Sequence, residues 1–299
     1  MSERIKRGTL CSLDSLGADE DMYGTATTVE TWLALEYDGR WSGEAFRESY
    51  IPETVKAAFK RYQDTFPNPR LQLVKKRKRS PDGIKLFMAH SREKDSVLYE
   101  ATLGAYEDLC DRDIDSLFGE RAKEPLFLIC TNGEHDKCCG KFGMPVYMEA
   151  AEGMYGENVW QSTHLGGHRF ASTFVCLPHG LYYGRVREGK TAERIFGEYK
   201  NGRIELMSYR GRSCYSAPVQ AAEYFLRRET GVREISAFYL NNVKEESGRI
   251  NVEFLAGEGG NIFRVNLRRL DSALRILKSC GDKERSFAPQ FRLLGIGEE

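Results

Sequence analysis

The sequence predicts an α/β protein with two units of similar element order and a small α+β region at its C-terminal end. Three observations favour this fold class. Strand-like and helix-like segments alternate, their order repeats once, and the last part of the chain carries alternating apolar segments separated by polar turns. The chain has 299 residues, more than one domain usually contains, so we expect two or three compact units.

The first unit, residues 1–119, is expected to begin with a strand over Thr28–Tyr37, which is rich in β-branched and aromatic residues and ends at a turn. A helix follows, because apolar residues recur at helical spacing from Val55 to Tyr62 and stop before Pro67. The rest of the unit is predicted to contain strands over 71–75, 84–89 and 96–102 and a second helix over 106–118.

The second unit, residues 120–200, is predicted to repeat this order. Its expected elements are a strand over 126–131, a helix over 145–155, strands over 158–163, 171–177 and 181–186, and a closing helix over 191–199. From this element order we infer two tandem thioredoxin-like units. A single mixed α/β domain with insertions is the alternative interpretation.

The third region, residues 201–299, has a different pattern. It is predicted to combine an amphipathic helix over 218–229 with a small antiparallel sheet made of 235–241, 250–255 and 261–265.

Charge and hydropathy exclude two classes of protein. Lysine plus arginine and aspartate plus glutamate number 44 each, so the chain lacks the basic excess of a general nucleic-acid binder. The N-terminal segment has no apolar signal region, and the longest apolar runs are too short to span a bilayer. We therefore expect a cytoplasmic protein without membrane contact.

Cysteine and histidine are concentrated in one part of the chain. Eight of the 13 such residues lie between positions 130 and 179, and this clustering favours metal binding over a disulfide framework. The remaining cysteines and histidines belong to no recognisable metal-binding motif. We expect small buried hydrophobic residues at Cys11, Cys110, Cys176, Cys214 and Cys280, and solvated or capped side chains at His135 and His179.

Two cysteines and two histidines are the candidate metal ligands. Cys130 follows a buried strand, and eight residues separate it from Cys139, which is longer than the spacing usual for structural zinc and suits a loop around a larger cluster. His164 and His168 are four residues apart, but the two glycines between them disfavour a helix and predict a tight loop. Leu165 stands where a zinc protease has its glutamate, so that activity is not expected.

The motifs CTNGEHDKCCG at 130–140 and VWQSTHLGGHRFA at 159–171 are similar to those of the sucrase/ferredoxin-like family, whose fungal members include bis-histidinyl thioredoxin-like ferredoxins. The resemblance extends over most of the chain up to about residue 230. It implies a thioredoxin-like fold and a [2Fe-2S] cluster bound by Cys130, Cys139, His164 and His168. Cys138 is a possible substitute ligand, although the family spacing and the following glycine favour Cys139.

The implied function is proton-coupled transfer of single electrons to or from a redox partner protein. Two thiolates and two imidazoles give a less negative site than four thiolates, which raises the reduction potential, and each imidazole keeps a titratable nitrogen. Asp136 and Arg169 flank the ligands and can either tune them by hydrogen bonds or be solvated surface residues. A structural zinc module, a sugar hydrolase and a thiol-redox enzyme are the alternative functions.

The basic run Lys75–Arg79 has two interpretations. It can attract an acidic redox partner, or it can protect an exposed sheet edge from pairing with other chains.

Overall fold

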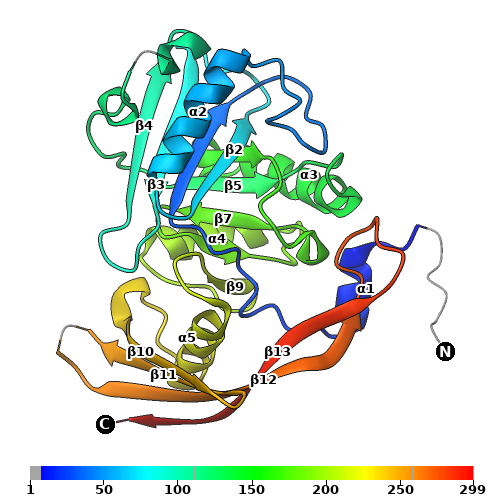
Figure 1. Ribbon diagram of the computed structural model, residues 1–299, viewed down its shortest axis with the longest axis vertical. Coiled ribbons are helices and arrows are strands. Elements are labelled where there is room, and N and C mark those ends of the chain that lie inside the picture. Colours follow the sequence, from blue (N-terminus) through cyan, green and yellow to red (C-terminus); the bar gives the residue numbers. More distant parts are fainter. Residues whose placement is uncertain (1–7, 111, 258, 299) are drawn as a thin grey trace.

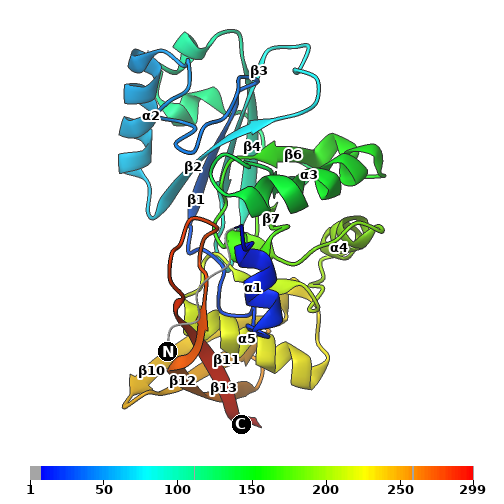
Figure 2. The same ribbon diagram turned by 90° about the vertical axis from the view of Figure 1, so that its right-hand side faces the viewer.

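A nine-stranded mixed sheet forms the centre of the computed structural model, which describes residues 8–110, 112–257 and 259–298 (Figures 1 and 2). Its strand order is β4-β3-β1-β2-β6-β5-β7-β8-β9. The strands are β1 (Thr31–Glu36), β2 (Pro69–Lys75), β3 (Ile84–His90), β4 (Val97–Leu103), β5 (Leu126–Cys130), β6 (Val159–Ser162), β7 (Phe174–Leu177), β8 (Leu181–Tyr183) and β9 (Tyr209–Arg212).

The two halves of this sheet have the same pairing pattern. In the first half, β1 runs parallel to β2 and antiparallel to β3, and β3 pairs antiparallel with β4. In the second half, β5 has the same relations to β6 and β7, and β7 pairs antiparallel with β8. Antiparallel pairing of β2 with β6 joins the halves into one sheet.

The hydrophobic core also spans the two halves. One cluster of buried side chains combines Trp32 and Val74 from the first half with Leu128, Trp160 and Val175 from the second. The sheet and this cluster both cross the boundary expected between residues 119 and 120. The division into units at 1–119, 120–200 and 201–299 therefore stays a proposal.

Helices cover the sheet through their apolar faces. Helix α2 (Glu53–Thr65) buries the predicted face from Val55 to Tyr62 against β1, β2 and β3, because those side chains recur once per turn. Helices α3 (Lys137–Glu152) and α4 (Thr191–Lys200) pack on β5, β7 and β8.

One helix prediction was wrong, and one helix begins earlier than predicted. In place of the helix expected over 106–118, the described residues form the short 3-10 turns η1 (Tyr106–Leu109) and η2 (Ile114–Leu117). Helix α3 begins at Lys137 and not near Pro145, because the side chain of Asp136 caps its first turn.

A second sheet lies at the C-terminal end, below helix α5 (Ala217–Thr230) in Figure 1. Its four antiparallel strands follow the order β10-β11-β12-β13, with bounds β10 (Phe238–Glu246), β11 (Arg249–Ala256), β12 (Ile262–Ile276) and β13 (Ser286–Glu298). The predicted antiparallel sheet is confirmed, but β12 is much longer than expected and β13 was missed. Few residues of β13 are buried, so it lacks a clear alternating pattern.

The β12–β13 hairpin extends away from α5 and reaches helix α1 (Cys11–Gly17), on the side where α3 lies (Figures 1 and 2). Segments from both ends of the chain thereby meet beside the second half of the large sheet.

The basic run Lys75–Arg79 does not protect a sheet edge, because its strand β2 lies inside the sheet between β1 and β6. That interpretation was wrong. Lys75 lies over the ring of Trp41, with its Nζ atom 4.2 Å from the ring centre, and Lys76 pairs with Glu157 at 2.9 Å. Within the described ranges, no helix has the combination of length and apolar character needed to cross a membrane.

Candidate metal centre

Cys130 and Cys139 are brought together by the packing of α3 against the end of β5. Cys130 is the last residue of β5, and Cys139 lies in the first turn of α3. Gly143 allows this close approach, since a Cβ atom at that position would overlap the carbonyl oxygen of Cys130. Both cysteines are buried, and their sulfurs lie within 4.8 Å of each other.

The two histidines come from the loop after β6, as the paired glycines predicted. Gly166 and Gly167 have φ values of 102° and 74°, a backbone conformation that glycine adopts readily and that interrupts a helix. The buried side chain of Arg210 stabilises the loop by donating a hydrogen bond of 3.0 Å to the carbonyl oxygen of Gly166. His168 then begins the 3-10 turn η4 (His168–Phe170).

These segments converge at one location. The ligand atoms of Cys130, Cys139 and His164 all lie within 4.8 Å of one another, and Sγ of Cys139 is 3.8 Å from Nδ1 of His164. The ring of His168 lies next to that of His164, with centroids 4.9 Å apart. Nδ1 of His168 is buried and has no hydrogen-bond partner among the described residues. Cys130, Cys139 and His164 thus form one group, His168 adjoins it only through His164, and the role of all four as ligands stays a prediction.

The electrostatic environment favours the metal-binding protonation state at Cys130 and His168 but not at Cys139. A hydrogen bond from Cys139 holds the pKa of the Cys130 thiol well below its usual range despite complete burial, with a further contribution from His164. The same contact, together with burial, raises the pKa of Cys139. Burial lowers the pKa of His168 even though Asp136 opposes the shift. Thiolates and neutral imidazoles are the forms that bind metals, so Cys130 and His168 are already in these forms, whereas Cys139 must lose its proton when a metal binds.

Asp136 and Arg169, which flank the candidate ligands in the sequence, have different surroundings. Oδ2 of Asp136 lies 3.9 Å from Nε2 of His168, which places a buried carboxylate beside a candidate ligand. Arg169 instead donates to Glu20 at 2.9 Å, and this ion pair holds the N-terminal segment. The observed contacts therefore support a tuning role for Asp136, whereas those of Arg169 are directed away from the four candidates.

His135 lies closer to the centre than the sequence indicated. Its ring stacks on that of His164, with centroids 3.9 Å apart and planes at 18°, and its Nδ1 is 3.0 Å from the carbonyl oxygen of Gly43. His135, His164 and His168 form a second group of potential ligand atoms within 4.8 Å of one another. The only signal in the sequence was the position of His135 in the loop between the two cysteines.

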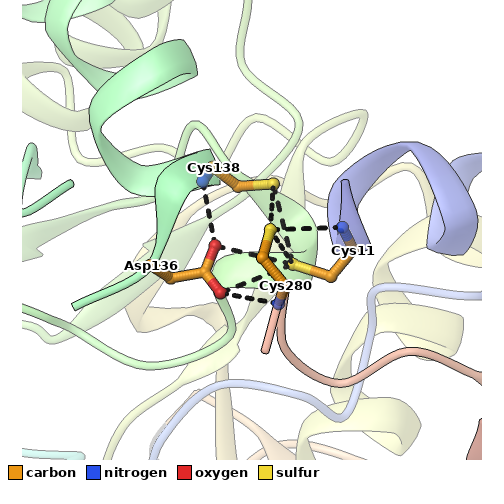
Figure 3. A group of neighbouring side chains, drawn as sticks. All are labelled: Cys11, Asp136, Cys138 and Cys280. Atoms are coloured by element: carbon orange, nitrogen blue, oxygen red, sulfur yellow. Dashed lines mark hydrogen bonds between the residues drawn. The ribbon is translucent and has the colours of Figure 1, made fainter. Parts of the chain in front are cut away.

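Cys138 does not substitute for Cys139 in this arrangement. Its side chain points into a separate buried group formed with Cys11, Asp136 and Cys280 (Figure 3). Cys11 is buried as expected, but Cys11 and Cys280 are not isolated, because folding brings them together from distant parts of the chain. Nothing in the local sequence around either residue indicated this contact.

A family match covers the segments that carry this centre. The sequence model of the sucrase/ferredoxin-like family matches residues 22–211. A segment of 97 residues is 32% identical to the "Altered inheritance of mitochondria protein 32" of Meyerozyma guilliermondii, and it covers 29% of this chain and 34% of that relative. The chain thus matches about a third of the relative's length. No solved structure matches significantly. The family match confirms the resemblance inferred from the two motifs, and the chain belongs to the sucrase/ferredoxin-like family.

Proposed function

We propose that this protein is a single-electron carrier that binds a [2Fe-2S] cluster through Cys130, Cys139, His164 and His168. The observation that carries the proposal is the meeting of two buried thiols with the His164 ring, and of that ring with His168. The two halves of the large sheet repeat one element order, which supports the thioredoxin-like units inferred from the sequence.

The donor set suits such a cluster. When bound, a [2Fe-2S] cluster supplies a centre that takes up and releases one electron. Two thiolates and two neutral imidazoles carry half the negative charge of four thiolates, so an added electron meets less repulsion and the reduction potential is higher. The nearby carboxylate of Asp136 opposes this effect in part.

The surroundings of the ligands define where a redox partner can approach. Cys130 and Cys139 are buried, whereas His164 and His168 are half-buried and His135 is exposed above them. A hollow of about 440 Å³ opens beside His164 and is lined by polar groups that include Arg47, Arg70 and Asn132. A partner protein would therefore meet the histidine side of the centre first.

Anaerobic purification followed by iron and sulfide analysis and electron paramagnetic resonance of the reduced protein tests this proposal. We expect a coloured protein with a resonance that is lost in Cys130→Ser and kept in Cys214→Ser, since Cys214 lies outside the centre. His164→Cys should keep a cluster and lower its reduction potential. A colourless wild-type protein with zinc on these four residues would refute electron transfer in favour of the structural alternative.

The cellular location is part of the same proposal. The sequence led us to expect the cytoplasm, while the name of the relative from Meyerozyma guilliermondii refers to mitochondria. We retain the cytoplasmic assignment, and cell fractionation with an antibody against this chain tests it.

A further inference from the structure

Three cysteine thiols from distant parts of the chain meet outside the centre described above. Cys11 comes from α1, Cys138 from the first turn of α3, and Cys280 from the loop between β12 and β13 (Figure 3). The sulfur of Cys138 is 3.6 Å from that of Cys11 and 3.4 Å from that of Cys280, and the remaining pair is separated by 3.6 Å. The three sulfurs thus form a nearly equilateral triangle.

Asp136 supplies a carboxylate to this group. Its Oδ1 and Oδ2 atoms lie 3.7 and 3.9 Å from the sulfur of Cys11, and all four potential ligand atoms lie within 4.8 Å of one another. The carboxylate is held by the N–H groups of Cys138 and Cys280, each at 2.9 Å, and by the hydroxyl of Ser279 at 3.1 Å. Its orientation is therefore set by three donors.

We propose that Cys11, Asp136, Cys138 and Cys280 bind one zinc ion and so fasten α1 and the β12–β13 hairpin to α3. A tetrahedral zinc ion with Zn–S bonds of about 2.3 Å holds its sulfur ligands about 3.8 Å apart, with sulfur–oxygen separations of about 3.5 Å. The observed separations in this group are close to both values. This site shares none of the four proposed cluster ligands, although Asp136 also contacts His168 at 3.9 Å.

Other uses of three clustered cysteines fit the geometry less well. A disulfide joins two sulfurs and leaves the third without a role, whereas three nearly equal separations suit one central atom. A [4Fe-4S] cluster binds each cysteine at a different iron atom and would hold the sulfurs much further apart.

Hydrogen bonds to sulfur complete the surroundings expected for metal-bound thiolates. The hydroxyl of Ser12 donates to the sulfur of Cys138 at 3.1 Å, and the backbone N–H of Cys11 donates to the sulfur of Cys280 at 3.5 Å. Three thiolates and a carboxylate leave a zinc site negatively charged, and such donors offset part of that charge. Cys11, Cys138 and Asp136 are buried, as in the closed sites that bind structural zinc.

Elemental analysis of the full chain, isolated anaerobically, tests the zinc site separately from the cluster. We expect about one zinc ion per chain in the wild type, in Cys130→Ser and in the control Cys214→Ser. Cys280→Ser should lose zinc at least fivefold and keep its iron, whereas Cys130→Ser should lose iron and keep its zinc. Equal zinc in Cys280→Ser and the wild type would overturn the proposal, whatever the iron content.

A second measurement uses the wild type alone, in case Cys280→Ser does not fold. Treatment with a zinc chelator should expose Cys11, Cys138 and Cys280 to alkylation and lower the melting temperature by about 5 °C or more. If two of these cysteines become alkylated only after addition of a reductant, they form a disulfide and the zinc assignment is wrong.

Discussion

At the scale of single residues, the adjacent cysteines of α3 serve two different groups. One step along a helix turns the side-chain direction by about 100°, so Cys138 and Cys139 cannot face the same neighbours. Cys139 faces Cys130 and His164, while Cys138 faces Cys11 and Cys280. Asp136 lies between the groups and contacts His168 on one side and Cys11 on the other.

Gly143→Ala tests the close contact that brings Cys139 to Cys130. The added methyl group would overlap the carbonyl oxygen of Cys130 and force α3 away from β5. We expect a loss of about 2 kcal/mol in the free energy of unfolding and reduced iron content, measured by denaturant titration and elemental analysis. Gly119→Ala is the control, since its Cβ atom would meet no atom within 4 Å. Full iron content in Gly143→Ala would show that this contact does not position the ligands.

At the scale of elements, a buried ion pair network joins α5 to the edge strand β9. Glu223 of α5 accepts hydrogen bonds from Arg212 and Arg227, each at 3.1 Å, and from the hydroxyl of Tyr209 at 2.8 Å. Glu223→Gln leaves two buried guanidinium groups without a carboxylate. We expect a loss of about 3–5 kcal/mol in the free energy of unfolding at neutral pH, measured by denaturant titration.

The same network predicts how stability depends on pH. Burial raises the pKa of Glu223, but Arg212 and Arg227 outweigh burial and hold it below its ordinary value. Its stabilisation is therefore complete above the unfolded pKa of about 4.3 and is lost as the pH falls through the lower folded value. Between about pH 5 and pH 3, the wild type and the exposed-pair control Glu229→Gln should lose more stability than Glu223→Gln. Equal losses of stability in all three proteins would mean that groups other than Glu223 cause the pH dependence.

At the scale of the whole molecule, α1 and the β12–β13 hairpin bring the N-terminal and C-terminal parts of the chain together beside the second half of the sheet (Figure 1). Asp14 of α1 accepts a hydrogen bond of 2.8 Å from the backbone N–H of Leu277 and pairs with Arg285 at 2.7 Å. Both partners flank the loop that carries Cys280. This contact holds α1 against the hairpin independently of any metal ion.

Asp14→Ala should loosen this contact between α1 and the β12–β13 hairpin without disturbing the rest of the fold. We expect faster hydrogen exchange in α1 and in residues 277–285, with a local loss of about 1–2 kcal/mol and unchanged exchange in β1 to β4. Glu53→Ala removes a more exposed ion pair, with Lys56, and should change exchange little. Uniform acceleration throughout Asp14→Ala would indicate global destabilisation instead of local opening.

Local patterns predicted much of this molecule. The apolar face of α2 and the glycine loop between the histidines are present, because each depends on neighbours within a few residues. The predicted repeat of element order is present up to the closing helix, which only the second unit forms. Predictions were less accurate where a capping side chain sets the start of a helix, or where long-range packing determines whether a strand forms. Asp136 starts α3 before Pro145, and β13 carries few buried residues by which to recognise it.

The sequence by itself determined the mixed α/β class from the alternation of its segments. It also determined the family and the choice of four candidate cluster ligands, since the two motifs that carry them are short and continuous. Only the tertiary structure decided that Cys138 and Cys139 face different groups, and that Cys11 and Cys280 belong with Cys138. The physical reason is distance along the chain. A side chain's direction depends on the packing of its helix, and a contact between residues 269 positions apart leaves no periodic signal in the sequence around either of them.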